Sequence, residues 1–342
     1  MSGPNSRWDT HWDAGHNWAV VLAAGEGSRL QALTMTASGV AVPKQFCSLG
    51  GGDSLLHAAL TRARAVAPAE RTCVVLAEHH RRWWQPLMLG VPAGNAIQQP
   101  SNRGTANGIL LPLLHILHRD PEAMLLVLPS DHFVKNETVM AASLRSAMAH
   151  VEEERDHHLL LLGLTPEEHD PELGYIVADG DDPARVRAVS EFVEKPSATA
   201  ARALIARGAV WNSFIFAARG QALLRAFEAR CPDIVGEMQH IVTGTDPAAC
   251  RIQLVRLYES LPHVDFSRDI LQSSPMLLHV LTVPPCGWSD LGTPRRVGEA
   301  VDRYDPMARE RSARPGGGAA FLDLAVRYLQ LRDVSCPMPA QS

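Results

Sequence analysis

The sequence predicts an α/β fold with a mixed, mostly parallel central sheet flanked by helices, followed by a small C-terminal helical appendage. Between residues 17 and 163, short apolar runs alternate with longer segments whose apolar residues recur at helical spacing. That alternation is the signature of a parallel sheet with crossover helices. Two of the runs, 124–128 and 159–163, are continuously apolar, which is typical of strands buried on both faces of a sheet.

The individual elements follow from local patterns. Strands are expected at 17–23, 73–77, 124–128 and 159–163 and, after a change of character at residue 164, near 175 and at 186–193, 210–216 and 278–283. Residues suited to cap a helix stand before several helical segments: Asp53 or Ser54, Asn136 and Ser197. Residues 79–84 are expected to begin a surface helix, and 220–275 to form helices joined by loops.

The composition excludes several classes of protein. The 342-residue chain has a formal net charge of −5, so it lacks the basic surface of a nucleic-acid-binding protein and its phosphate recognition must be local. Six scattered cysteines without a Cys-x-x-Cys pair argue against a disulfide framework and a zinc site, and they favour a reducing, cytoplasmic location. No apolar run reaches the roughly 18 residues that a membrane span needs, and the polar N-terminus is unlike a signal peptide.

The loop after the first strand has the properties of a phosphate-binding loop. The strand runs into Gly25 and Gly27, and Arg29 and Lys44 bring positive charge. Glycine lets backbone N–H groups approach an anion closely, and the cations neutralise the anion. The Gly-Lys pair of a P-loop is absent, and Leu30 stands where the dinucleotide fingerprint has its third glycine. Taken alone, Gly-x-Gly after a strand is equally compatible with an ordinary turn.

A carboxylate follows the apolar strand 124–128. Asp131 stands just past the carboxyl end of that strand, where open α/β sheets place their ligands. Mg²⁺ accompanies a triphosphate and is typically held by one or two carboxylates together with phosphate oxygens. We therefore expect Asp131 to be a magnesium ligand; the alternative for an aspartate in this position is a turn or cap residue.

Several motifs together resemble a known family. They are Ala-Ala-Gly-x-Gly-x-Arg-Leu at 23–30, Pro-Lys-Gln-Phe at 43–46, Gln-x-x-x-x-Gly-Thr-Ala at 99–106, Pro-x-Asp-His at 129–132, Glu-Lys-Pro at 194–196 and Trp-x-Asp-x-Gly-Thr at 288–293. This set resembles the sugar-1-phosphate nucleotidyltransferases, and Pro-Lys-Gln-Phe looks like the mannose-1-phosphate guanylyltransferase branch. The resemblance implies a Rossmann-like fold of the nucleotide-diphospho-sugar transferase type.

The resemblance also implies a reaction and a set of roles. The reaction is GTP plus mannose 1-phosphate giving GDP-mannose and pyrophosphate, with Mg²⁺ as cofactor. The catalytic domain would be 17–295, with a nucleotide half at 17–163 and a sugar-phosphate half at 164–295, between a leader at 1–16 and the appendage at 296–342. The implied catalytic residues are Arg29, Lys44 and Lys195; the nucleotide-binding residues Ala23, Ala24, Gly25, Gly27, Gln99, Gly104 and Thr105; the sugar-phosphate-binding residues Gly174, Glu194, Lys195 and Asn212; and the metal ligands Asp131 and Asp290.

Two alternatives stay open at the level of sequence. The same chemistry on another pair, glucose 1-phosphate with UTP or dTTP, is compatible with the motifs, and Phe214 stands where many relatives have a small residue, which reshapes the sugar pocket. A non-catalytic, nucleotide-sugar-binding regulatory protein is the other alternative, although such a protein would be expected to lose some charged site residues. The C-terminal region is a candidate for packing on the core or for forming a homo-oligomer.

Overall fold

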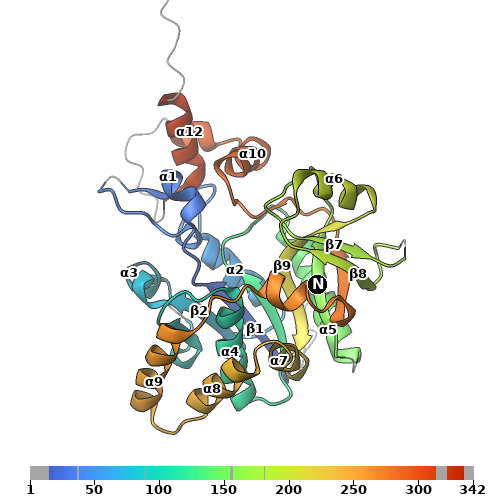
Figure 1. Cartoon of the computed structure of the whole chain (residues 1–342). Helices are drawn as coiled ribbons and strands as arrows, with labels where there is room; N and C mark the ends of the chain where they lie inside the picture. The colour runs from blue at the N-terminus through green and yellow to red at the C-terminus, as the bar shows by residue number, and fades with distance from the viewer. Residues whose placement is uncertain are drawn as a thin grey trace, which may run out of the picture.

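The computed structural model describes residues 15–36, 38–88, 90–154, 157–180, 182–312 and 322–334. The described residues form a central sheet with helices packed against it (Figure 1). The expected leader lies outside the described residues except for its last two positions, and Cys336 also lies outside them. Among the described helices, none combines the length and apolar character that a bilayer crossing demands.

The central sheet is mixed. Its strand order is β3, β2, β1, β4, β9, β6, β10, β8, β7, and β7 also pairs with the start of β9, so the last five strands form a closed ring of pairings. Pairing is parallel from β3 to β4 and between β6 and β10, whereas β9 and β8 are antiparallel to their neighbours. The strands are β1 (Asn17–Ala23), β2 (Thr72–Ala77), β3 (Ala96–Gln99), β4 (Met124–Pro129), β6 (Leu159–Leu164), β7 (Tyr175–Ala178), β8 (Arg187–Val193), β9 (Val210–Arg219) and β10 (Leu278–Val283), with β5 (Phe133–Val134) and β11 (Trp288–Ser289) forming a separate two-stranded sheet.

One neighbour relation differs from what the order of elements suggests. β4, a helix and β6 follow one another along the chain like a parallel crossover unit, yet β9 lies between β4 and β6 and is antiparallel to both. Gly163 near the end of β6 pairs with Asn212, so the amino end of β9 lies at the edge where β4 and β6 end. Strand partners of this kind are chosen by side-chain packing between distant segments, which local sequence does not reveal.

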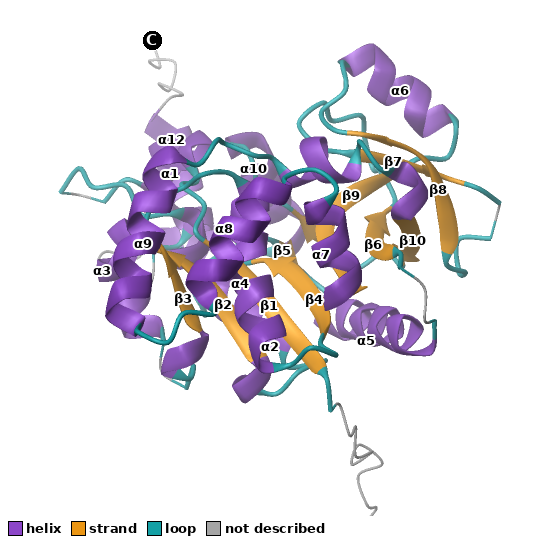
Figure 2. Cartoon of the chain, turned by 60° about the horizontal axis from the view of Figure 1, so that its bottom comes forward, coloured by secondary structure: helices purple, strands orange, loops and turns teal. Residues whose placement is uncertain are grey.

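Helices cover both faces of the sheet (Figure 2). Successive residues of β1 belong to different apolar cores: Val21 packs with Leu56 and Leu144 on one face, and Val20 packs with Leu113 on the other. This alternation is what a strand buried on both faces requires. The helices are α1 (Gln31–Thr34), α2 (Leu55–Ala63), α3 (Arg81–Trp84), α4 (Thr105–Arg119), α5 (Glu137–Glu153), α6 (Ala198–Ala206), α7 (Gly220–Glu228), α8 (Pro232–Val242), α9 (Pro247–Ser260), α10 (Pro294–Tyr304), α11 (Ala308–Ser312) and α12 (Leu324–Val334).

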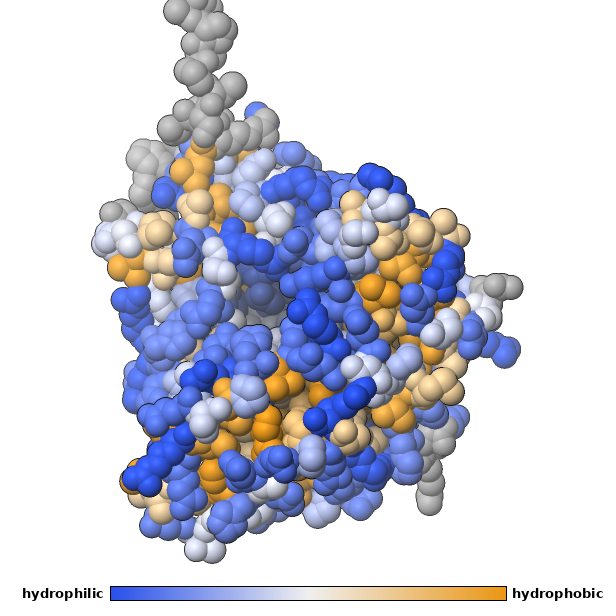
Figure 3. Space-filling model, in the orientation of Figure 1, coloured by the Kyte–Doolittle hydropathy of each residue, from blue (hydrophilic) through white to orange (hydrophobic). Residues whose placement is uncertain are grey.

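The caps that the sequence predicts are present. Ser54, Asn136 and Ser197 each accept a hydrogen bond from a backbone N–H in the first turn of α2, α5 and α6, respectively. At the other end of the chain, α10 begins at Pro294 and crosses the expected domain boundary, and α12 packs near α1 (Figure 1). The surface in Figure 3 is hollowed near its centre, where hydrophilic residues border the hollow, and apolar residues gather below it and to its right.

Candidate active site

A cleft of about 330 Å³ collects most of the expected site residues. Its walls come from the loop after β1, the start of α4, the end of β4, the segment before β7, the end of β8, the start of β9 and the segment after β11. All expected site residues line this cleft except Ala23, Gly27 and Lys44, and Lys44 contacts the lining residue Asp131. The cleft therefore joins residues from both halves of the chain at one edge of the sheet.

The loop after β1 is fixed from behind by Gln45. This buried amide donates from Nε2 to the carbonyl oxygens of Ala23 and Gly25, both at 2.9 Å. Gly27 has φ 62, and a Cβ there would come within 3.1 Å of the Lys44 nitrogen, so only glycine fits without displacement. A Cβ on Gly25 would meet nothing within 4 Å, which leaves that part of the backbone open to the cleft.

Lys44 is buried and joins the two expected metal ligands. Its Nζ lies 2.9 Å from Asp131 Oδ2 and donates to the carbonyl oxygen of Asp290 at 2.6 Å. Burial opposes ionisation of Asp131, but the charge and hydrogen bond of Lys44, together with His132 and a backbone hydrogen bond, outweigh burial, so the pKa of this carboxyl is lowered. Lys44 thus keeps Asp131 ionised at the floor of the cleft.

His132 lies beside Asp131 and is uncharged. Burial lowers the pKa of His132 to about 4, so its ring is neutral at physiological pH. The Trp288 indole donates to His132 Nδ1 at 3.2 Å, which places the ring proton on Nε2, 3.7 Å from Asp131. The arrangement makes His132 a structural partner of Asp131.

Asp290 presents a buried carboxylate oxygen that accepts no hydrogen bond from the described residues. Its Oδ1 is buried and makes no hydrogen bond, and the nearest cation is Arg296 at 3.4 Å. Its Oδ2 would be 2.2 Å from a Cβ on Gly292, so the carboxylate lies against a backbone position that requires glycine. Leu291 has φ 46, and this left-handed conformation in a buried leucine turns the chain sharply beside Asp290.

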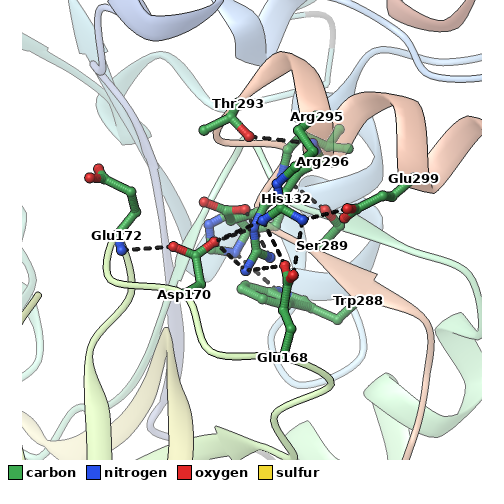
Figure 4. Close-up of polar contacts among 12 residues, drawn as sticks. His132, Glu168, Asp170, Glu172, Trp288, Ser289, Thr293, Arg295, Arg296 and Glu299 are labelled. Atoms are coloured by element: carbon green, nitrogen blue, oxygen red, sulfur yellow. Dashed lines mark hydrogen bonds and ion pairs between the residues drawn. The ribbon is translucent and has the colours of Figure 1, made fainter. Parts of the chain in front are cut away.

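Arg296, which lies 3.4 Å from Asp290, forms a buried ion pair with Asp170, and Figure 4 shows this pair. Arg296, in the first turn of α10, donates from Nε to Asp170 Oδ2 at 2.8 Å, and its Nη2 lies 2.7 Å from the same oxygen. Asp170 in turn accepts from the backbone N–H of Glu172 at 2.7 Å. Through Arg296 the Asp290 segment is therefore connected to the loop that leads to Gly174.

The segment expected to contact the nucleobase packs against Val264 and against the first residue of a π-helical turn, Phe266–Leu271. Gly104 has φ 91, and a Cβ there would lie 2.2 Å from the Val264 carbonyl oxygen, so glycine is required. The Gln99 amide is buried and donates to the Tyr258 hydroxyl at 3.0 Å, and Thr105 Oγ1 accepts from the Phe266 backbone N–H at 2.8 Å. All three expected residues line the cleft while holding this segment in place.

The end of the cleft that is expected to receive the sugar phosphate, called the sugar-phosphate end below, is formed by Gly174, Glu194 and Asn212. A Cβ on Gly174 would come within 2.6 Å of Glu194 Oε2 and 3.2 Å of Asn212 Cβ, so the three residues are in close contact. Glu194 Oε2 is buried and has no hydrogen-bond partner among the described residues. Burial, with Asp265 adding to it, raises the pKa of Glu194 to about 7. Near neutrality this carboxyl is partly protonated and can donate or accept.

This pKa predicts a pH-dependent stability. The folded state holds the Glu194 proton more tightly than the unfolded chain, so stability falls as pH rises from the ordinary value of 4.5 through about 7. Glu194→Gln removes this effect. Between pH 5 and pH 8 the free energy of unfolding of the wild type should therefore fall by up to about 3 kcal/mol relative to that of the variant. Urea unfolding of both proteins at the two pH values measures the change. Stability curves that stay parallel would mean that Glu194 ionises freely in the folded protein.

Lys195 and Arg29 are the two exposed cations of the cleft. Lys195 has φ 49, a strained conformation for a side chain of this size, and it makes no hydrogen bond or ion pair with the residues that the structure describes. Arg29 Nη1 donates to Glu172 Oε2 at 2.9 Å, and both side chains are about half exposed. The Arg29–Glu172 pair therefore bridges the nucleotide half and the sugar-phosphate half across the cleft.

Four residues of this arrangement are not among those expected from sequence. Gln45 belongs to the Pro-Lys-Gln-Phe motif, so the motif indicates that this residue lies near the site, although the motif does not predict its hydrogen bonds to the loop after β1. Asp170, Glu172 and Arg296 carry no comparable signal, because charged residues near a helix start or a proline are common on protein surfaces. Their importance appears only in the contacts described above.

Comparison with known proteins agrees with the motifs. The Nucleotidyl transferase family profile matches residues 18–305. A mannose-1-phosphate guanylyltransferase of Escherichia coli (strain K12) is 31% identical over 287 residues, which are 81% of this chain and 58% of that protein. The xanthan biosynthesis protein XanB of Xanthomonas campestris pv. campestris (strain B100) is 31% identical over 279 residues, 80% of this chain and 57% of that protein. The chain thus spans less than two thirds of the length of these relatives.

Solved structures show the same fold. The crystal structure of a mannose-1-phosphate geranyltransferase from Thermus thermophilus has a TM-score of 0.72 and 27% identity, covering 84% of this chain and 80% of that one. The crystal structure of a mannose-6-phosphate isomerase from Helicobacter pylori, 20% identical with a TM-score of 0.62, covers 80% of this chain and 99% of that one and shows a likeness of fold alone. The profile match over most of the chain, on the fold and cleft described above, shows that the chain belongs to the nucleotidyl transferase family.

Proposed function

We propose that the cleft transfers the guanylyl group of GTP to mannose 1-phosphate, giving GDP-mannose and pyrophosphate. The observation that carries the proposal is the convergence of Arg29, Lys195, Asp131 and Asp290 on one cleft, although they lie far apart along the chain. The choice of mannose is supported by the names of the Escherichia coli and Thermus thermophilus relatives, and the choice of guanylyl by the name of the Escherichia coli relative and by the Pro-Lys-Gln-Phe motif.

The reaction brings two anions together. An oxygen of the sugar phosphate attacks the α-phosphorus of GTP, a new P–O bond forms, and the bond from the α-phosphorus to the β-phosphate oxygen breaks as pyrophosphate leaves. Most of the work is positioning and neutralisation of charge. A phosphate monoester, with a second pKa of about 6, is already a good nucleophile near neutrality, so the reaction needs no side-chain general base.

The residues of the chain divide this work between the two halves. Backbone N–H groups of the loop around Gly25, together with Arg29, would hold the triphosphate. Lys195 would bind the phosphate of the sugar, and Glu194 and Asn212 would hydrogen-bond sugar hydroxyls. The Arg29–Glu172 pair must open for Arg29 to bind phosphate, and an exposed pair of this kind costs little to open.

The two aspartates fit a magnesium ion. Hard oxygen donors are what Mg²⁺ prefers, and the buried Asp290 Oδ1 accepts no hydrogen bond from the described residues, with Arg296 3.4 Å away. Asp131 and Asp290 would hold the ion, whose charge would help to neutralise the reacting phosphates. Lys44 remains beside both residues and keeps Asp131 ionised.

Asp290→Asn should weaken the dependence on metal. Loss of a charged ligand is expected to raise the Mg²⁺ concentration for half-maximal activity at least about tenfold. The measurement is a Mg²⁺ titration of initial rates at fixed substrates, with Asp302→Asn, an exposed aspartate on α10, as the control. A titration curve identical to that of the wild type would remove Asp290 from the metal site.

Pyrophosphate release across a grid of substrates tests the proposal as a whole. The grid combines four nucleoside triphosphates with mannose 1-phosphate and glucose 1-phosphate, and GTP with mannose 1-phosphate is expected to give the highest kcat/KM. A maximum with UTP or dTTP and glucose 1-phosphate would assign the same chemistry to that pair. Binding without turnover for every pair would favour a regulatory protein on this fold.

A further inference from the structure

The strand β9 is distorted at Phe214, inside the cleft. Leu161 pairs with Phe216 and Gly163 pairs with Asn212, so residues 213–215 stand opposite a single residue of β6. Phe214 has φ 59, a left-handed conformation that glycine adopts freely and that is strained for an aromatic residue. Bulges and strained residues of this kind cluster at functional sites, where the surrounding structure holds them in place.

Side-chain hydrogen bonds hold this distortion. The Phe214 backbone N–H donates to Asn212 Oδ1 at 3.1 Å, and the Ser213 hydroxyl donates to the Leu162 carbonyl oxygen at 2.6 Å. The Ile215 backbone N–H donates to the Ser213 hydroxyl at 3.1 Å. Asn212 Oδ1 already accepts from Phe214, and Asn212 Nδ2 donates to Ser267 Oγ at 3.5 Å, so the second N–H of the amide is the part of Asn212 best placed to serve a ligand.

The Phe214 ring forms an apolar part of the cleft wall. It is half-buried and lines the cleft beside Asn212 and Ser267, which are polar. Its ring meets Phe266 edge-on, with centroids 6.2 Å apart, and Phe266 stacks on Phe216 at 5.0 Å. Because Phe266 and Phe216 are buried core residues, the ring of Phe214 is backed by a fixed surface and cannot easily withdraw from the cleft.

We propose that Phe214 is a specificity-determining residue of the sugar-phosphate end of the cleft. Its ring favours sugar 1-phosphates that turn C–H groups toward it and disfavours those that carry an added polar or bulky substituent on that side. A polar group facing the ring gives up its water and gains no hydrogen bond there, and a bulky group meets a wall that does not move. The inference rests on the proposed function, because it assumes that this end of the cleft receives the sugar.

Three substitutions separate the effect of the ring from that of the strained backbone. Phe214→Gly removes both the ring and the strain, and Phe214→Asn removes the ring with a residue that tolerates a left-handed conformation. Phe214→Leu keeps an apolar side chain and the strain. If the apolar wall selects the sugar, the glycine and asparagine variants should change specificity together and the leucine variant should stay close to the wild type.

The experiment measures kcat/KM for mannose 1-phosphate and N-acetylglucosamine 1-phosphate at saturating GTP. The ratio of the second to the first should rise about tenfold or more in Phe214→Gly and Phe214→Asn, which is the range that one group in an apolar pocket can discriminate. The KM for GTP should stay within about twofold of the wild type. The proposal would be overturned by a ratio that is the same in all four proteins. It would also be overturned by a rise in the KM for GTP as large as the change in kcat/KM for mannose 1-phosphate.

Failure of the proposed function gives a different result. If the preferred nucleotide is UTP or dTTP, the same ratio is measured with that nucleotide. If the wild type releases no pyrophosphate with any pair, calorimetric binding of the two sugar phosphates to the same four proteins replaces the kinetic ratio. A ratio of dissociation constants that shifts in the glycine and asparagine variants would still support Phe214 as the selecting residue. An unchanged ratio, or no binding of either sugar phosphate to the wild type, would overturn this inference as well.

Discussion

Arg296→Ala should lower the free energy of unfolding by about 3–5 kcal/mol, because it leaves the buried Asp170 carboxylate without its closest ion-pair partner. Arg296 is 5% exposed, contacts Asp170 at 2.7 and 2.8 Å and lies 3.4 Å from Asp290. The Asp170 carboxylate would keep the Glu172 backbone N–H at 2.7 Å and Arg295 at 3.7 Å, and these do not replace the two close contacts that it loses. The measurement is urea unfolding at pH 7, and activity should fall with stability because the same residue positions the Asp290 segment.

The neighbouring Arg295 provides a matched control. Its side chain is 52% exposed and pairs with Glu168 and Glu299 at the surface, in the same turn of α10 (Figure 4). Exposed pairs contribute little, so Arg295→Ala should cost no more than about 1 kcal/mol. Equal losses in the two variants would show that burial of Arg296 does not decide its contribution.

Lys195→Ala and Arg29→Ala should both reduce catalysis strongly but in different ways. Under the proposed mechanism, each substitution removes a charge-assisted contact to phosphate, worth about 2–4 kcal/mol at the transition state. Lys195 lies at the sugar-phosphate end, so its loss should appear in kcat/KM for mannose 1-phosphate. Arg29 lies beside the loop after β1, so its loss should appear in kcat/KM for GTP.

Steady-state kinetics with each substrate varied in turn separates these two effects. Arg185→Ala, at an 83% exposed position away from the cleft residues, should leave both constants unchanged. Thermal unfolding of all variants checks that the folded state is retained. If Lys195→Ala and Arg29→Ala showed the same defect toward both substrates, the division of roles between the two halves would be wrong.

Local features of the fold were accessible from sequence because their causes are local. Ser54, Asn136 and Ser197 cap helices through hydrogen bonds to residues three positions away, and the spacing of those residues is visible in the chain. The continuous apolar runs of β4 and β6 similarly predict that these strands are buried on both faces. The place of β9 between those strands was not accessible, since it depends on contacts between segments about 50 to 90 residues apart.

The candidate site divides in the same way. The sequence by itself determined the family motifs, the glycines that the loops require and the charged residues available for phosphate and metal. Only the tertiary structure decided that Arg296 is buried against Asp170, that Arg29 pairs with Glu172 and that Phe214 lines the cleft. The physical reason is that burial and pairing set the energy of a charge or a ring, and both depend on residues brought close by folding.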